Sequence, residues 1–319
     1  MSKYRKQPLD LSALRTIPIK LRGGKVRVED FAAPYRKGAG VGAWLDALPR
    51  VLAADCFRAV LEALAAARAN RKPILWGLGG HVIKCGLAPI LLDLIERGYA
   101  TGFAMNGAAA IHDFEIAIAG QTSEDVEAVL PDGRFGTAEE TGCEMNRAIA
   151  EGDRDGLGMG EALGRHLEPL ADPQFSRYSL LLGAYRSSTP VTVHVALGTD
   201  TPHTHPAADP AAIGRATHRD FRLFCSLVSE LNEGGVYLNV GSAVMLPEVF
   251  LKAVSVVRNL GHPLRQFTTL DLDFLPHYRP RVNVVERPHA RSGGRGISLR
   301  GHHELMLPLL AAALIEREP

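Results

Sequence analysis

The sequence predicts an α/β protein built on a doubly wound, open parallel sheet with helices on both faces, which is a three-layer arrangement. Apolar segments of strand length alternate along the chain with segments of helical periodicity. Short turns rich in glycine and other small residues follow the strand-like segments. Parallel strands joined by helices take right-handed crossovers, so this alternation favours one continuous sheet.

The first part of the chain is expected to contain an arm and the start of the sheet. Residues 1–45 are polar and predict a loop-rich arm with one short strand, followed by a single α/β domain over 46–319. The apolar spacing of residues 48–69 is typical of an amphipathic helix. The sheet then begins with an expected strand at 74–76, a glycine-rich turn at 77–86 and a helix at 88–98.

The rest of the chain continues this alternation around two irregular stretches. Residues 121–178 are polar and rich in glycine, and we expect an insertion or the lid of a site. Residues 276–300, rich in arginine, proline and glycine, predict a long loop. The remaining strands are expected at 99–107, 191–197, 235–241 and 267–274, and the remaining helices at 108–120, 219–231, 242–261 and 302–316.

Composition limits the classes of partner and compartment. With 46% hydrophobic residues, 22% charged residues and a formal net charge of +1, no global field attracts nucleic acid or an anionic membrane. The basic excess of the arm predicts a solvated segment. The four cysteines are widely spaced and form no C-x-x-C pair, which favours a reducing compartment. The first residues lack the apolar stretch of a signal peptide, so we expect a cytoplasmic protein.

The candidate binding residues follow the predicted strands, because open parallel sheets bind ligands beyond the carboxyl ends of their strands. Small residues there allow phosphates to approach backbone N–H groups, although glycines also serve simply to make tight turns. These strand-end residues are Gly79, Gly80 and His81; Asn106 and Gly107, with His112 and Asp113 one turn later; Asp200, His203 and His205; Gly241 and Ser242; Asp271 and Asp273.

The loop GTDTPHTHP is the strongest candidate for catalytic side chains. Histidine is suited to proton transfer near neutral pH, so Asp200, His203 and His205 are candidate catalytic residues. The H-x-H spacing also allows a metal site completed by His194, but no H-E-x-x-H or C-x-x-C signature supports a metal. A purely structural, hydrogen-bonded loop is the third possibility.

A second basic segment lies before the last predicted helix. His302 and His303 stand where the stretch RPHARSGGRGISLRG meets that helix. A helix N-terminus beside arginines would bind a phosphate or carboxylate, whereas the plain alternative is an exposed basic loop.

The order of these motifs resembles a known family. The region from 74 to 119 resembles the NAD-binding core of the deoxyhypusine synthase family, in which a second small-residue turn corresponds to MNGAAAIHDFE. The segments PVTVHVALGTD, LNVGSAVMLPEVFL and RGISLRGHHELMLPLLAAAL resemble later strands, turns and the final helix of that family. The same region is also similar to the NAD-using C-terminal domain of arginine dihydrolase/ornithine cyclodeaminase-type proteins.

The resemblance implies a Rossmann-like, deoxyhypusine synthase-like fold, NAD as cofactor, and a homodimer or homotetramer with sites at a subunit interface. The implied NAD contacts are Gly79, Gly80, His81, Asn106, Gly107, Asp200, Gly241, Ser242, His302 and His303.

One departure argues against a genuine deoxyhypusine synthase. That family forms an imine with a lysine in its C-terminal loop, but beyond Lys84 the only lysine here is Lys252, inside a predicted helix. Arginine, which fills that loop, cannot lose its proton to become the nucleophile. The leading hypothesis is an NAD-dependent enzyme acting on a small metabolite, with an amine or amino acid as the expected class. The alternatives are a non-catalytic NAD- or nucleotide-binding protein and a metal-dependent hydrolase using the His203/His205 loop.

Overall fold

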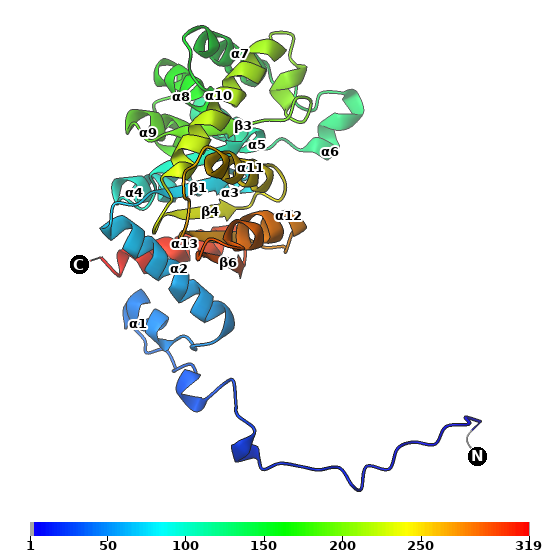
Figure 1. Cartoon of the computed structure of the whole chain (residues 1–319). Coiled ribbons are helices and arrows are strands. Elements are labelled where there is room, and N and C mark those ends of the chain that lie inside the picture. The colour runs from blue at the N-terminus through cyan, green and yellow to red at the C-terminus, as the bar shows by residue number, and fades with distance from the viewer. Residues whose placement is uncertain (1–2, 319) are drawn as a thin grey trace.

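The centre of the protein is a six-stranded, all-parallel sheet with the order β3-β2-β1-β4-β5-β6 (Figure 1). This computed structural model describes residues 3–318. The order reverses between β1 and β4, which is the arrangement of a Rossmann-like sheet. The predicted doubly wound α/β fold is therefore confirmed.

The strands are short, and all but β6 are almost completely buried, as expected for parallel strands covered by helices. Five of them coincide with segments predicted from the alternating pattern. These five are β1 (Ile74–Leu78), β2 (Gly102–Asn106), β3 (Val191–His194), β4 (Val236–Val240) and β5 (Thr268–Asp273). The sixth strand, β6 (Arg295–Arg300), was not predicted from that pattern.

Two apolar cores separate the sheet from its two helical layers. Trp76 and Leu238 pack into the larger core, while Leu75 and Tyr237, one residue away on the same strands, pack into the smaller one. Burial of a leucine such as Leu75 or Leu238 contributes about 1.5–3 kcal/mol. The larger core also contains side chains of α2 (Leu52–Ala69), α4 (Ala88–Glu96), α5 (Gly107–Ala119) and α13 (His303–Ile315), and the smaller one those of α10 (Pro210–Ser229) and α11 (Met245–Asn259).

The N-terminal arm differs from the prediction, because residues 3–45 contain no strand. They form two 3-10 turns, η1 (Ile19–Leu21) and η2 (Val28–Asp30), and the start of α1 (Gly40–Ala47). The arm runs away from the sheet (Figure 1), so no neighbouring strand can pair with it. Apolar side chains along it are consequently exposed: Leu9 is 88% and Ile19 77% accessible.

The predicted loop 276–300 is also corrected. It contains the short helix α12 (Tyr278–Pro280), a π-helical turn η6 (Arg281–Glu286), a 3-10 turn η7 (Arg287–His289) and the edge strand β6. In β6 only Ile297 and Leu299 are buried, and the alternating residues are polar or glycine. Two apolar positions among arginines and glycines are too few for a strand signal, and pairing with β5 decides the conformation.

The polar stretch 121–178 lies between β2 and β3 and is largely helical. It contains α6 (Val126–Val129), η3 (Leu130–Asp132), α7 (Glu139–Arg154), α8 (Met159–Leu170) and η4 (Ser176–Tyr178), and α9 (Leu180–Arg186) leads back to β3. Helix α8 packs against β3, and α7 packs against α8 and α10. Within residues 3–318, no helix is long and apolar enough to cross a membrane.

Candidate functional site

The carboxyl ends of β1 and β4 meet where the strand order reverses, and glycines let the chain pack closely there. A Cβ added to Gly79 would lie 2.0 Å from the carbonyl oxygen of Gly241. Gly241 has φ +68°, and a Cβ there would lie 2.7 Å from Nε2 of His303. At this switch point the space beside the glycines is thus filled by the protein's own atoms.

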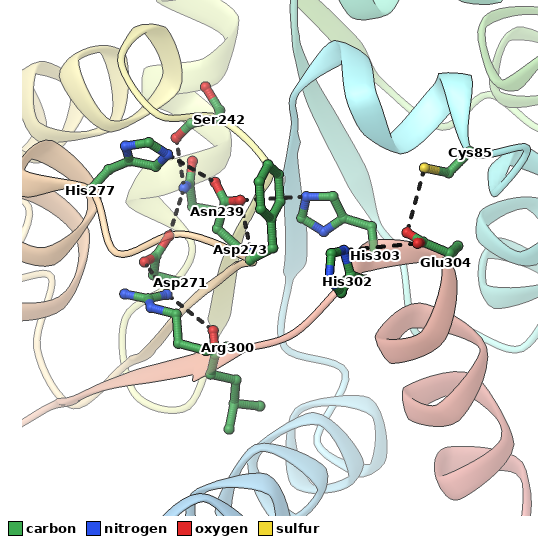
Figure 2. Close-up of polar contacts among 12 residues, drawn as sticks. Cys85, Asn239, Ser242, Asp271, Asp273, His277, Arg300, His302, His303 and Glu304 are labelled. Carbon is green, nitrogen blue, oxygen red and sulfur yellow. Dashed lines mark hydrogen bonds and ion pairs between the residues drawn. The ribbon is translucent and has the colours of Figure 1, made fainter.

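A buried polar network joins the ends of β4, β5 and β6 (Figure 2). Nδ2 of Asn239 donates to Oδ1 of Asp271 at 3.0 Å and to the carbonyl oxygen of Ser242 at 3.0 Å. Arg300 donates from Nη1 to Oδ2 of Asp271 at 2.9 Å. Burial raises the pKa of Asp271, although Asn239 and Arg300 act in the opposite direction. The network holds three strand ends in fixed positions.

His303 lies beside this network with its hydrogen-bonding capacity unused. Its side chain is fully buried, and neither ring nitrogen has a hydrogen-bond partner within residues 3–318. Nε2 lies 3.7 Å from Oδ1 of Asp273, and burial lowers the pKa of His303. Figure 2 shows the imidazole directed at Asp273, and the adjacent His302 is exposed. Buried nitrogens without partners are what a polar ligand would satisfy.

Aromatic rings lie next to His303 at the carboxyl ends of the strands. Phe274 stacks on His302 with ring centroids 5.7 Å apart, and the ring of His81 lies 5.9 Å from that of Phe274. His81, His302 and Phe274 are exposed, whereas His303 is buried behind them. Three residues predicted to bind the cofactor, His81, His302 and His303, therefore come together at this point.

A second feature is a cavity of about 1010 Å³ between α5, α7 and the segment after α5. Its lining is strongly acidic, with five carboxylates and a single ammonium group, that of Lys84 at the end of the short helix α3 (Gly80–Lys84). We call it the acidic cavity, and its carboxylates are Glu115, Glu124, Glu140, Glu144 and Asp200. Such a lining favours positively charged ligands.

Asp200 is the only predicted catalytic residue that lines the acidic cavity. Its carboxylate lies on the first turn of α5, and its Oδ2 is buried without a hydrogen-bond partner. Burial raises its pKa. The side chain of Asn106, a predicted cofactor contact, is engaged as the N-cap of α5, where it accepts from the N–H of Ala109 at 2.9 Å.

His203 and His205 do not line the cavity. Nδ1 of His203 accepts from the N–H of Gly198 at 3.3 Å, and Nδ1 of His205 accepts from that of Ala207 at 3.1 Å. Nε2 of His205 lies 3.5 Å from Glu139 on α7. Their catalytic role stays a prediction; the N–H of His203 donates to the carbonyl oxygen of Asp200 at 3.1 Å, but of the three side chains only that of Asp200 lines the cavity.

His194, the fourth residue considered for a metal site, lies inside the protein. Its Nε2 lies 3.0 Å from Oγ1 of Thr192, and burial lowers its pKa to about 3. Among residues 3–318, no three His, Cys, Asp or Glu side chains are grouped as metal ligands. The histidines of the GTDTPHTHP loop are thus not brought together with His194.

The acidic cavity contains a hydrogen-bonded chain that the sequence only hinted at. His112 and Glu115 are three residues apart on α5, so they share one face of the helix. Nδ1 of His112 lies 2.7 Å from Oγ1 of Thr122, whose hydroxyl donates to Oε2 of Glu115 at 2.5 Å. Thr141 on α7 donates to Oε1 of Glu115 at 3.2 Å. The expectation that binding residues follow the strands indicated His112. It did not indicate Glu115, Thr122 or Thr141.

Asp113, adjacent to His112, has a structural role. Its carboxylate accepts from the N–H groups of Leu180 at 2.6 Å and Leu181 at 2.9 Å and from the hydroxyl of Ser179 at 2.6 Å. It therefore binds the start of α9 and points away from the acidic cavity.

The strand order and the crossover between β1 and β4 define a Rossmann-like α/β fold, and solved structures share it. A proposed deoxyhypusine synthase from Entamoeba histolytica is similar, with a TM-score of 0.51, 9% identity, and coverage of 90% of this chain and 96% of that one. ArgZ, an arginine dihydrolase from Cyanobacteria, gives a TM-score of 0.51, 15% identity and 85% coverage of this chain. AgrE, solved as a ternary complex with ornithine and NAD⁺, gives a TM-score of 0.52, 15% identity and 84% coverage of this chain.

The present chain spans only 34% of the length of ArgZ and of AgrE. No protein-family model matches the sequence, and no curated protein matches it significantly. The structural similarity to the two kinds of protein that the sequence resembles is confirmed, at the level of the fold.

Proposed function

We propose that the chain is an NAD-dependent enzyme that acts on a small amine or amino acid held in the acidic cavity. The observation that carries the proposal is the position of this cavity beside the glycine turn after β1. A Cβ at Gly80 would lie 3.0 Å from Cβ of Ala108 and 3.3 Å from Cδ2 of His112, both of which line the cavity. A ligand in the cavity would thus lie next to the turn where a Rossmann-like sheet binds its nucleotide.

Unpartnered polar atoms at the switch point between β1 and β4 support NAD as the cofactor. The unpartnered nitrogens of His303 and the unpartnered Oδ1 of Asn239 are buried polar atoms that a nucleotide would satisfy. His81 and His302 lie beside the exposed Phe274, whose ring offers a stacking surface. NAD supplies a hydride acceptor when it is bound. The chain's own residues would bind it, orient it and exclude water.

The acidic cavity favours an amine as the second ligand. Glu144 is already paired with Arg147 at 2.8 Å, whereas Oδ2 of Asp200 has no hydrogen-bond partner. An ammonium group donates three hydrogen bonds and would pair with such carboxylates. The complex of AgrE with ornithine and NAD⁺ supports the same pairing of a cationic amino acid with NAD. Without a lysine in the C-terminal loop, we do not assign hypusine formation.

Calorimetric titration tests the proposal. NAD should bind saturably, and 1,4-diaminobutane should bind whereas its uncharged analogue 1,4-butanediol should not. Formation of NADH in the presence of L-ornithine or related amines would then show catalysis. Binding of NAD without turnover of any amine would support the non-catalytic alternative, and absence of NAD binding would refute the proposal.

A further inference from the structure

The hydrogen bonds that link the side chains of His112, Thr122 and Glu115 have a defined donor-to-acceptor direction. Burial alone would raise the pKa of Glu115, but hydrogen bonds from His112, Thr122 and Thr141 outweigh it and lower that pKa. Glu115 is therefore ionised at neutral pH and can only accept hydrogen bonds. The single hydroxyl proton of Thr122 points to Glu115 at 2.5 Å, so its oxygen accepts from Nδ1–H of His112.

This direction leaves the other nitrogen of His112 free. With the proton on Nδ1, a neutral imidazole carries its lone pair on Nε2. No hydrogen bond within residues 3–318 engages Nε2, and the side chain is 17% exposed in the lining of the acidic cavity. The adjacent ring atom Cδ2 lies against Gly80, so the Nε2 edge faces the turn after β1.

The two histidines of the GTDTPHTHP loop have the opposite arrangement. In both, Nδ1 accepts a backbone hydrogen bond, from Gly198 for His203 and from Ala207 for His205. When these imidazoles are neutral, the proton is on Nε2 and the lone pair of Nδ1 is already used. His112 is thus arranged to accept a proton, and His203 and His205 are not.

We propose that His112 accepts a proton from the ammonium group of a cationic substrate in the acidic cavity. The ammonium N–H bond breaks with its electron pair remaining on the substrate nitrogen, and a new N–H bond forms at Nε2. The products are a neutral amine, which is the form that can lose a hydride, and an imidazolium. Oε2 of Glu115, 3.9 Å from Nδ1, balances the new positive charge. Thr122 and Glu115 are positioning residues. This inference rests on the proposed function.

The tautomer of His112 can be measured without any substrate. In ¹⁵N-histidine-labelled protein at neutral to mildly alkaline pH, His112 should show a protonated Nδ1 and a bare Nε2. Thr122→Val keeps the size of the side chain and removes the acceptor, so the Nδ1–H signature should be lost. Glu115→Gln should weaken it. A bare Nδ1 in the parent protein would overturn the inference.

Chemical modification tests whether Nε2 faces the cation. Diethyl pyrocarbonate modifies bare imidazole nitrogens, and at 1,4-diaminobutane near ten times its Kd the modification of His112 should slow about tenfold. 1,4-Butanediol should not protect. The exposed His218 in the same sample reports the reagent concentration and should not be protected. His112→Gln should remove the protected peptide signal.

The outcomes separate this inference from the proposed function. If calorimetry shows that the diamine binds but His112 is not protected, His112 does not face the substrate and the inference fails. If the diamine does not bind at all, the proposed function fails, and the tautomer measurement still decides the state of His112.

Discussion

The carboxylate of Asp200 rests directly on Gly107: a Cβ added to this glycine would lie 2.0 Å from Oδ2 of Asp200. The contact joins the loop after β3 to the first turn of α5, and it places Asp200 at one wall of the acidic cavity. Gly107 was expected to leave space for a phosphate, but Asp200 occupies that space. Substitutions at Gly107 therefore disturb the packing against Asp200 whether or not a ligand is bound.

Gly107→Ala should lower the free energy of unfolding by about 1–3 kcal/mol, because the new methyl group overlaps Asp200 and forces a backbone shift. Gly214→Ala is the matched control, since Gly214 lies in α10 and a Cβ there meets no atom within 4 Å. It should raise stability by about 0.5–1 kcal/mol. Urea denaturation of both variants measures the difference, and equal stabilities would contradict the contact.

Asp200→Asn should weaken binding of 1,4-diaminobutane by about tenfold, because a charge-assisted contact contributes roughly 1.5–3 kcal/mol. The same change should raise stability at neutral pH, since burial raises the pKa of Asp200 and its ionised form is costly in the folded state. Calorimetry and thermal unfolding measure the two effects. Asp132→Asn, at an exposed residue outside the cavity, should change neither. Unchanged affinity in Asp200→Asn would remove this residue from the site.

Asp220→Asn should change the pH dependence of stability. Asp220 accepts from the N–H groups of Gly160 at 2.9 Å and Val193 at 2.7 Å, and burial raises its pKa to about 7. The folded state therefore retains a proton that the unfolded state releases near pH 4. The stability contributed by protonated Asp220 is complete below pH 4 and is lost as the pH rises through about 7.

The free energy of unfolding of the parent minus that of Asp220→Asn should therefore fall by about 1.4 kcal/mol per pH unit across this window. The difference cancels the contribution of His194, whose lowered pKa has the opposite sign. Urea denaturation at several pH values from 4 to 7 provides the measurement. A constant difference would mean that Asp220 titrates normally.

His112→Gln and His205→Ala, compared side by side, decide which histidine transfers protons. General acid–base groups contribute about 10²–10⁴-fold to turnover. We expect a loss of this size from His112→Gln, with NAD affinity nearly unchanged, because the free Nε2 lines the acidic cavity. Steady-state kinetics with any amine that is turned over measures both variants. A larger loss of turnover in His205→Ala than in His112→Gln would instead assign proton transfer to His205 in the loop after β3.

The N-terminal arm should take part in oligomerisation. Its apolar side chains are exposed, with Leu9 88% and Val28 71% accessible, and such residues favour burial against another subunit. Light scattering at micromolar concentration should give a mass of a dimer or tetramer of the 34.4 kDa chain. Removal of residues 1–35 should reduce the number of subunits per particle, calculated from the measured mass and the mass of the shortened chain. A monomer mass for the full chain would contradict this expectation.

Local patterns in the sequence account for most of the fold. The five predicted strands and their helices follow from the alternation of apolar and polar residues, which reflects burial within each element. The glycines after β1 and β4 were also correctly placed at strand ends, since tight turns there require them. These features depend on residues within one element or turn, and a local pattern is sufficient to predict them.

The tertiary structure decided what depends on distant segments. Strand β6 has only two buried apolar residues and forms because β5 offers a free edge. Thr141 comes from α7 to hold Glu115 of α5, and Asp200 comes from the loop after β3 to cover Gly107. The sequence by itself determined that polar residues gather at the carboxyl edge of the sheet. Which of them meet depends on how helices pack in three dimensions, and sequence periodicity carries no information about that packing.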